Sequence, residues 1–480
     1  MGKLNGLKPE KVFKFFEEIS AIPHGSANME KIAEYCVSFA KERNLKFVRD
    51  NANNVIIYKD ATENYENSGA VILQGHLDMV CQKEEGNEID FLSDGLDLYV
   101  DGDFVKARGT TLGADNGIAV AMVLAILDSD NLSHPPIEAV FTTDEEIGMV
   151  GALQLDMSLL KGRKMINLDA EEDGILTVSC AGGSDFLMII PVSREEKSGE
   201  AVEITLRGLK GGHSGVEIHD GRVNADILAG RFLNHLNKKV SFSLVSVDGG
   251  DKGNAIPNMS RISVVTNEKE SFVEECRNYL ETIRKEISER EPSFEYSVDE
   301  KGKNAVNALS EECKKKVIFA LNSAPNGVVE MSKEINGLVE TSLNLGILKT
   351  DEEKILLHFA LRSNKKSALL SLEEKLITFA EYLECEYETG GHYPPWEYNA
   401  NSSLQELYKE CFMEENGYEP RFEAIHAGLE CGVFASALEN LDCVAMGPAL
   451  WDVHTVNEKL SVSSAERTFN LVIKMLEKCR

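Results

Sequence analysis

The chain has 480 residues, 43% of them hydrophobic, and its 80 acidic against 50 basic side chains give a formal charge of -30. A chain of this length is too long to fold around one ordinary hydrophobic core, so two domains are expected. The negative charge disfavours nucleic acid and anionic membranes as partners. No apolar run of bilayer length and no secretory leader are evident, and the ten cysteines are scattered without paired spacing. We therefore expect a cytoplasmic protein with reduced thiols.

The N-terminal part alternates helical and strand patterns. A helix is expected after Pro9, where apolar residues recur at helical spacing, and a second over about 29–43. A hairpin is expected over 46–60, around the paired asparagines. The segments VILQGHLDMV, IEAVFTT and KMINLDA are predicted strands, and GIAVAMVLAILDS is a predicted buried helix. This order is typical of an α/β fold in which helices sandwich a mixed sheet.

The pattern changes after about residue 183. Strands such as FLMIIPV, AVEITLRGL, SRISVVTN and ILLHFALRS alternate with amphipathic helices over about 270–290 and 371–383. The order β, α, β, β, α, β runs through twice, which predicts an α+β domain with an antiparallel sheet covered on one face. Two ferredoxin-like halves would have this order. Helices near 402–414 and 464–478 restore the first pattern. We therefore expect a discontinuous domain of residues 1–183 and 393–480, with residues 184–392 inserted.

Histidine and acidic side chains follow several predicted core elements. His76 and Asp78 end a strand at positions i and i+2, so in an extended chain they share a face, although one such pair is more often structural. Further acids are Asp115 in GTTLGADNG, Asp144, Glu145 and Glu146 in VFTTDEEIGMVGA, and Asp169 in MINLDAEEDG. Taken singly, Asp115 could cap a helix, and the adjacent glutamates could form a charged first turn.

These side chains are expected to converge at the carboxyl ends of the strands, where open α/β sheets bind ligands. Gathered carboxylates repel one another unless cations neutralise them, and mixed histidine and carboxylate ligands suit zinc, manganese or cobalt. The sequence therefore predicts a pair of metal ions. His454, in the polar loop of GPALWDVHTVNEKLSV, has by itself the character of a surface histidine.

Two glycine-containing motifs superficially resemble ligand-binding loops, but each lacks residues that such a loop requires. LRGLKGGHSGV lacks the Gly-Lys-Ser/Thr of a phosphate-binding loop. DGLDLYVDGDF lacks the twelfth-position glutamate and the flanking helices of a calcium loop, so Asp101-Gly102 is interpreted as a hairpin turn.

Taken together, GHLDMVCQK, GTTLGADNG, TTDEEIGMVGA, INLDAEE, GLKGGHSG and HAGLECG resemble the cytosolic aminoacyl-histidine dipeptidases, a carnosinase-like group of the di-zinc aminoacylase and carboxypeptidase clan. The resemblance runs through essentially the whole chain. It implies a zinc exopeptidase-like catalytic domain and an inserted lid domain that could pair with a second copy in a homodimer. The implied activity is hydrolysis of unblocked dipeptides, including Xaa-His dipeptides such as β-alanyl-histidine.

The resemblance also implies a metal centre with two Zn²⁺ per subunit, for which Co²⁺ or Mn²⁺ could substitute. The implied ligands are His76 and Asp169 for one ion, Glu146 and His454 for the other, and Asp115 as the bridge between them. Asp78 would orient the His76 imidazole, as partners of ligating histidines do. Glu145 would be the general base that takes a proton from the zinc-activated bridging water.

Substrate contacts are implied less strongly. His213 matches the histidine that stabilises the oxyanion, with His219 as a second candidate and a plain turn histidine as the structural alternative. Arg362, in FALRSN, could clamp the substrate carboxylate, although a surface arginine explains it almost as well. The remaining candidates for the pocket are Asn254 and Asn258 of GNAIPN and His426 and Glu430 of HAGLECG. Glu430 suits an ammonium group, which needs a negative partner in a closed site.

Two other functions remain open at this stage. An N-acyl amino acid deacylase or a tripeptidase could use the same scaffold, and a requirement for a free amine would separate these from a dipeptidase. A catalytically silent binding protein is the other alternative. Silent relatives would be expected to lose the base or a ligand, whereas Glu145, Asp115, His76 and His454 are all present.

Overall fold

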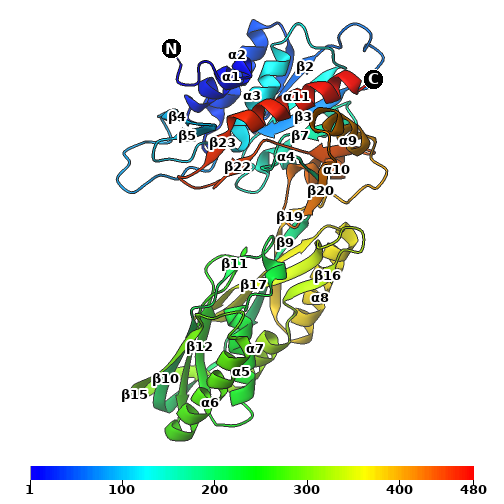
Figure 1. Cartoon of the computed structure of the whole chain (residues 1–480). Coiled ribbons are helices and arrows are strands. Elements are labelled where there is room, and N and C mark those ends of the chain that lie inside the picture. The colour runs from blue at the N-terminus through cyan, green and yellow to red at the C-terminus, as the bar shows by residue number, and fades with distance from the viewer. Residues whose placement is uncertain (1) are drawn as a thin grey trace. The chain divides into compact units, whose positions relative to one another are not determined.

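The structure is a computed structural model that describes residues 2–480. The chain divides into two compact units. The first contains residues 1–180, 398–424 and 429–480, and the second contains residues 181–397 and 425–428. The mixed α/β fold predicted from the sequence is confirmed (Figure 1).

The first unit is built on an eight-stranded sheet with the order β1-β2-β6-β3-β7-β21-β8-β20. The strands are β1 Lys46–Arg49, β2 Val55–Lys59, β3 Val71–His76, β6 Ile137–Thr142, β7 Lys164–Asn167, β8 Ile175–Cys180, β20 Arg421–Ile425 and β21 Asp442–Ala445. Its central strands β6, β3, β7 and β21 are parallel, whereas β1 and β2 form the predicted antiparallel hairpin. Every residue of β3 and β6 is buried, as expected for strands covered on both faces.

Helices pack around this sheet. They are α1 Glu10–Ser20, α2 Glu30–Glu42, α3 Ala114–Leu127, α4 Val150–Gln154, α9 Ser403–Asn416, α10 Glu430–Ala437 and α11 Val462–Lys478. The apolar helix α3 lies against β3 and beneath α1, which explains why it carries no polar face (Figure 1). A small four-stranded sheet joins β4 Leu98–Asp101, β5 Phe104–Ala107, β23 Lys459–Ser461 and β22 Leu450–Trp451. The predicted hairpin of β4 and β5 turns at Gly102 and Asp103, one residue later than expected.

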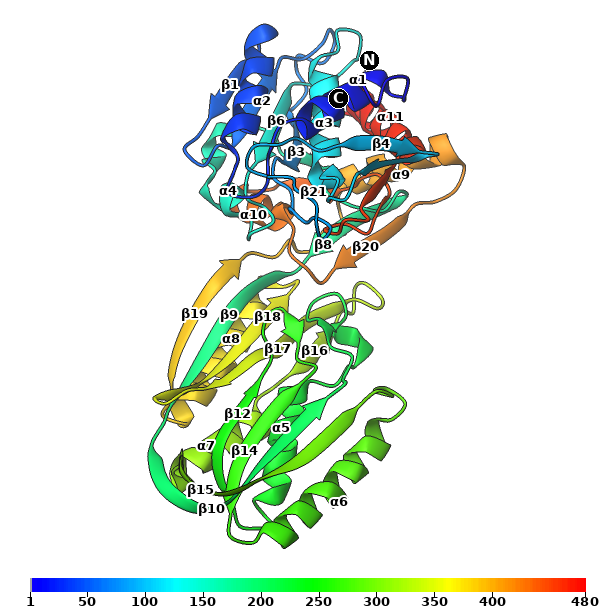
Figure 2. The same cartoon turned by 90° about the vertical axis from the view of Figure 1, so that its left-hand side faces the viewer.

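The second unit contains a nine-stranded antiparallel sheet. Along the sheet the strands are β15 Glu295–Leu309, β10 Arg194–Arg207, β14 Ser260–Thr266, β12 Ser243–Gly249, β17 Val339–Thr350, β18 Lys354–Ser363, β9 Gly182–Pro191 and β19 Glu386–Tyr393, and β16 Gly327–Met331 pairs with β17. The helices are α5 Ala225–Leu236, α6 Lys269–Ile287, α7 Glu311–Ser323 and α8 Lys366–Tyr382. They lie on one face of the sheet, as the sequence predicted (Figure 2). The short strands β11 Gly212–His213 and β13 Ala255–Ile256 pair separately.

The two β, α, β, β, α, β patterns of this unit are nested and not consecutive. One pattern runs β10, α5, β12, β14, α6, β15, and its strands lie in the order β15-β10-β14-β12. The other begins earlier, with β9, and resumes only at α7, β17, β18, α8 and β19, in the mirrored order β17-β18-β9-β19. Each half therefore has the ferredoxin-like order, and one half is inserted after the first strand of the other.

Two further findings concern the cysteines and the helices of residues 2–480. All ten cysteines are free thiols, and all but Cys81 are buried. No helix there combines the length and apolarity needed to cross a bilayer.

Candidate active site

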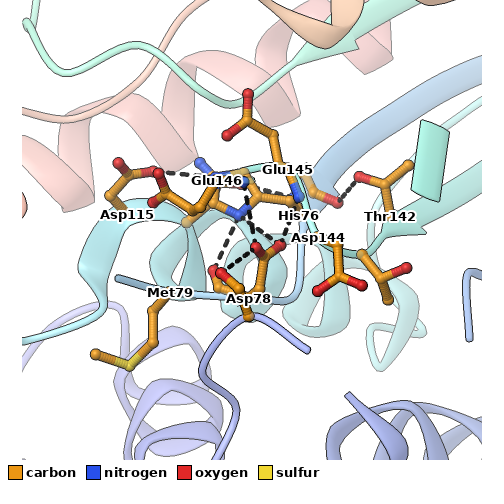
Figure 3. Close-up of polar contacts among 12 residues, drawn as sticks. His76, Asp78, Met79, Asp115, Thr142, Asp144, Glu145 and Glu146 are labelled. Atoms are coloured by element: carbon orange, nitrogen blue, oxygen red, sulfur yellow. Dashed lines mark hydrogen bonds and ion pairs between the residues drawn. The ribbon is translucent and has the colours of Figure 1, made fainter. Parts of the chain in front are cut away.

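The candidate metal ligands of the first unit gather at the carboxyl ends of its parallel strands. His76 is the last residue of β3, and Asp169 follows β7 by two residues. Glu145 and Glu146 follow β6 in a turn, while α4 begins only at Val150. The alternative that these glutamates form the first turn of a helix is therefore wrong. Figure 3 shows how His76, Asp115 and Glu146 approach one another.

Asp115 lies between the two histidines. Its Oδ1 is 3.1 Å from Nε2 of His76, and its Oδ2 is 3.1 Å from Nε2 of His454. The same His454 nitrogen lies 2.9 Å from Oε1 of Glu146. The structure does not show Asp115 as a helix cap, because its two carboxylate oxygens face histidine nitrogens and accept no backbone N–H of the helix in the described chain. Its carboxylate is thus directed at both imidazoles, and the Asp115–Asn116 peptide bond is cis.

Asp169 completes the group on the side of His76. Its Oδ1 is 3.5 Å from Nε2 of His76 and accepts a hydrogen bond from the Asn116 amide (2.7 Å). The Asn116 amide nitrogen also donates to the Leu168 carbonyl oxygen (2.9 Å), and its oxygen accepts the His76 backbone N–H (3.2 Å). The buried Asn116 therefore connects the start of α3 with the end of β3 and with the residues that follow β7.

Asp78 anchors the turn that carries the two glutamates. Its carboxylate accepts the backbone N–H groups of Glu145 (3.0 Å) and Glu146 (3.2 Å) and the hydroxyl of Ser26 (2.9 Å). Nδ1 of His76 lies 3.5 Å from the Asp78 carboxylate and only 2.9 Å from the Asp78 backbone oxygen. The carbonyl is thus the nearer partner of the imidazole, and the carboxylate serves mainly the glutamate turn.

The electrostatics of this cluster favour cations. Hydrogen bonds to Asp115 and Glu146 raise the pKa of His454 to about 11. Burial alone would lower the pKa of His76, but the charge of Asp169 and the hydrogen bond to Asp115 raise it well above its ordinary value. Protons on the two imidazoles therefore balance the acids, and metal ions could take their place.

The side chains gathered here have the donor atoms that divalent metals prefer. One ligand atom each from His76, Asp115 and Glu146 lies within 4.8 Å of the others, so the three could hold one metal ion. Imidazole nitrogen with carboxylate oxygen suits zinc, manganese or cobalt. The two oxygens of Asp115 face different histidines, so the carboxylate can be shared by two ions.

Glu145 makes no hydrogen bond through its side chain among the described residues, unlike its neighbour Glu146. Burial raises the pKa of Glu145 well above its ordinary range, and the charges of Asp169 and Glu430 add to this effect against that of His76. A carboxyl group with a raised pKa can both take and return a proton near neutral pH.

Glu430, which begins α10, is fully buried in the first unit. Its Oε2 accepts hydrogen bonds from Thr142 (2.7 Å) and Gln74 (2.5 Å), whereas Oε1 has no partner in the described chain. Burial raises the pKa of Glu430 to about 7. Glu430 is therefore hydrogen-bonded to one side chain of β3 and one of β6.

Three candidate substrate residues meet in the second unit around Gly215. A Cβ atom at this glycine would lie 2.6 Å from the His426 carbonyl oxygen, 2.8 Å from Cε1 of His213 and 3.1 Å from Nε of Arg362. No side chain fits there. The glycine of HSG is thus explained by the close packing of His213, His426 and Arg362.

His213 has a defined tautomer in this cluster. Its Nδ1 accepts backbone hydrogen bonds from Gly215 and Val216, both at 3.1 Å, so the proton of the neutral ring is assigned to Nε2. Burial, together with the charge of Arg362, lowers the pKa of His213. The ring is therefore neutral at physiological pH and offers one N–H donor. His219, by contrast, has a side chain 54% exposed beside Asp220.

Arg362 and His426 form the inner part of the cluster. Nη1 of Arg362 donates to the Tyr393 hydroxyl (2.9 Å), and its buried Nε has no partner in the described chain. His426 pairs with Ser342 (2.7 Å) and Asn364 (3.2 Å), and burial, aided by the charge of Arg362, lowers its pKa to about 3. An arginine with an unused buried donor is a suitable anion partner, and the surface-arginine alternative does not fit this environment.

Asn254 and Asn258 have different surroundings in this unit. The Asn254 carbonyl oxygen accepts the Ser214 N–H (2.9 Å), while its side chain is exposed. Asn258 lines a cavity of about 560 Å³ together with Lys210, Lys252 and other residues. His213 and Arg362 are not among the residues lining that cavity.

Sequence reasoning missed several positioning residues. Asn116 follows Asp115 directly, and its position in GADNG was a usable signal. Ser26 and Glu458 carried no such signal, because their contacts with Asp78 and with the backbone before Asp115 join segments distant in the chain.

Comparisons with known proteins show the family of the chain. Residues 72–478 match the model of peptidase family M20/M25/M40. The chain is 37% identical over 481 residues to the cytosol non-specific dipeptidase of Escherichia coli (strain K12), and the match covers 99% of each chain. The structure of the aminoacylhistidine dipeptidase from Vibrio alginolyticus has a TM-score of 0.91 and 38% identity, covering 99% of this chain and 98% of that one. Aminopeptidase PepT from Bacillus cereus, with a TM-score of 0.56 and 15% identity over 98% of this chain and 99% of that one, shares the fold alone.

The chain therefore belongs to peptidase family M20/M25/M40. It is a metallopeptidase, a hydrolase acting on peptide bonds, and the two relatives that it matches along its whole length bear dipeptidase names. The resemblance to the aminoacyl-histidine dipeptidases, predicted from six short motifs, is confirmed.

Proposed function

We propose that this peptidase is a cytoplasmic, zinc-dependent dipeptidase that cleaves unblocked dipeptides, including Xaa-His dipeptides such as β-alanyl-histidine. The observation that carries the proposal is the placement of Asp115 between His76 and His454. The names of the E. coli and Vibrio relatives support the substrate class and, for the former, the cytosol.

For the metal centre, we assign His76 and Asp169 to one Zn²⁺, Glu146 and His454 to the other, and Asp115 to both. Co²⁺ or Mn²⁺ could substitute, since they accept the same ligand types. When bound, such ions polarise the scissile carbonyl group and bring the pKa of water toward about 7.

Glu145 is the general base in this proposal. It accepts a proton from the attacking water and delivers it to the leaving amine nitrogen, a role that its raised pKa supports. Asp78 holds the backbone of Glu145 and Glu146 in position by accepting hydrogen bonds from their two N–H groups. The adjacent glutamates therefore have separate tasks, one in proton transfer and one in metal binding.

The second unit serves as a substrate-binding lid in this proposal. His213 donates Nε2–H to the oxyanion, and Arg362 binds the terminal carboxylate with the Nε–H that lacks a protein partner. His426, Asn254 and Asn258 contribute further polar contacts, and Glu430 of the first unit is the candidate partner of the free amine. We also propose that the lid pairs with a second copy in a homodimer.

The substitution Glu145→Gln tests the proposal. It removes the proton acceptor and preserves the shape of the side chain, so kcat for β-alanyl-histidine should fall about 10²- to 10⁴-fold while two metal ions remain bound. The control Glu138→Gln changes a buried glutamate in β6 whose carboxylate accepts backbone N–H groups of Lys161 and Gly162. Wild-type turnover in Glu145→Gln would contradict the assignment.

A substrate panel separates the alternatives. After chelation and zinc return, the enzyme should cleave free dipeptides and leave their N-acetylated forms intact. Preferred cleavage of acetylated amino acids would indicate a deacylase, and preferred cleavage of three-residue peptides a tripeptidase. If no amide is cleaved by the zinc-loaded chain, the silent binding protein is the correct alternative.

A further inference from the structure

Glu458 makes an unusual set of hydrogen bonds to the backbone in the first unit. The residue lies directly before β23 and is 3% exposed. Its carboxylate accepts four hydrogen bonds from consecutive backbone N–H groups: Oε2 from Leu112 (2.8 Å) and Gly113 (3.2 Å), and Oε1 from Ala114 (2.9 Å) and Asp115 (3.4 Å). Both oxygens are thus fully used by one short segment.

This segment ends with Asp115, the residue placed between the two histidines. Gly113 has a left-handed φ of 65°, and Asp115 departs from helical angles, so the segment cannot pair its own donors as a regular helix would. Buried N–H groups without acceptors are costly, and the Glu458 carboxylate supplies acceptors for four of them. The backbone position of Asp115 therefore depends on Glu458.

The same glutamate belongs to the turn that carries His454. The turn is closed by hydrogen bonds from the Thr455 N–H to the Asp452 carbonyl oxygen (3.2 Å) and from the Glu458 N–H to the Thr455 carbonyl oxygen (3.2 Å). The Asn457 N–H donates to the Thr455 hydroxyl oxygen (3.1 Å). His454 and Glu458 thus belong to one hydrogen-bonded turn. His454 contacts the carboxylate of Asp115, and Glu458 accepts a hydrogen bond from the Asp115 backbone N–H.

We propose that Glu458 is a positioning residue of the metal centre. It joins the backbone of residues 112–115 to the turn of residues 454–458, so that Asp115 and His454 keep the separation that a second cation requires. Glu458 does not contact His76, Glu146 or Asp169 through any hydrogen bond of the described chain. This inference rests on the proposed metal centre and adds a residue that was not among the candidates from the sequence.

The alternative is that Glu458 only stabilises the fold. Glu138 offers a matched control, because it is also a buried glutamate of the first unit, 4% exposed, that accepts backbone N–H groups of a turn, from Lys161 and Gly162 at 3.0 Å. Replacing either glutamate by glutamine keeps its size and turns one acceptor oxygen into an NH₂ donor that faces backbone N–H groups. Glu138 lies on β6 outside the ligand group, so only its structural role is lost.

The experiment compares the metal-free full-length wild type with Glu458→Gln and Glu138→Gln. Each is titrated with Co²⁺, and calorimetry and the visible Co²⁺ spectrum report affinity and ligand geometry. Glu458→Gln should bind the second ion about 10- to 100-fold more weakly, with a changed spectrum, as seen for partners of metal ligands. Glu138→Gln should keep the wild-type dissociation constants and spectrum.

Two results would overturn the inference: wild-type Co²⁺ binding by Glu458→Gln, or equal weakening by both variants. If wild type itself takes up no Co²⁺, the proposed metal centre fails, and the inference fails with it. If Glu458→Gln does not fold, hydrogen exchange of the metal-loaded wild type decides. The N–H groups of residues 112–115 should then exchange slowly, and exchange as fast as in exposed loops would refute the role of Glu458.

Discussion

Asp226 of the second unit should make the stability of the chain depend on pH. It lies in the first turn of α5, is fully buried, and neither of its carboxylate oxygens has a hydrogen-bond partner in the described chain. Burial raises the pKa of Asp226 to about 8, and the charge of Asp248 adds to the effect. In an unfolded chain the pKa of an aspartate is about 3.9, so the two states bind protons differently at neutral pH.

The sign and size follow from proton linkage. Below about pH 4 both states are protonated, and stability does not depend on this group. Between about pH 4 and 8 only the folded state keeps the proton, so rising pH progressively destabilises the fold until the carboxyl ionises. One pKa unit corresponds to about 1.4 kcal/mol, so the change between about pH 6 and 9 is about 2 to 3 kcal/mol.

The variant Asp226→Asn isolates this contribution, since asparagine has the same size and does not ionise. Urea unfolding gives the free energy of unfolding of both proteins. The value for the variant minus that for wild type should rise by about 2 to 3 kcal/mol from about pH 6 to 9. The exposed Asp251 supplies the control, because Asp251→Asn should leave that difference constant. Parallel pH profiles of Asp226→Asn and wild type would refute the reasoning.

Two further predictions concern the site. Asp78→Asn places an NH₂ group against the N–H groups of Glu145 and Glu146, so metal affinity measured by calorimetry should fall about 10- to 100-fold; unchanged affinity would show that the turn does not need the carboxylate. Arg362→Lys removes the Nε donor, so KM for a dipeptide should rise about 10- to 100-fold while KM for the corresponding dipeptide amide stays constant. An equal rise for both substrates would argue against carboxylate recognition.

The elements of the fold could be predicted because their patterns are local. The apolar run of β3, the apolar helix α3 and the alternating β18 all lie where the sequence placed them. The nesting of the two lid halves could not be predicted in this way. Its cause is the pairing of β9 with β18, about 170 residues later, and periodicity carries no information on such distant partners.

The candidate site was predictable in its residue types and less so in its supports. Acids and histidines stand out here because they recur after several predicted elements of one sheet, and the structure brings His76, Asp115 and Glu146 together. The three hydrogen bonds of the Asn116 side chain and the four backbone contacts of Glu458 depend on tertiary packing, so the partners of these residues could not be predicted from the sequence.

The most direct test of the proposed metal centre is a calorimetric titration of the metal-free chain with Zn²⁺, repeated on His454→Ala. The geometry around Asp115 predicts two Zn²⁺ per wild-type chain and the loss of one site in the variant. A wild type that binds fewer than two ions, or a variant that still binds two with unchanged affinity, would contradict the shared role of Asp115.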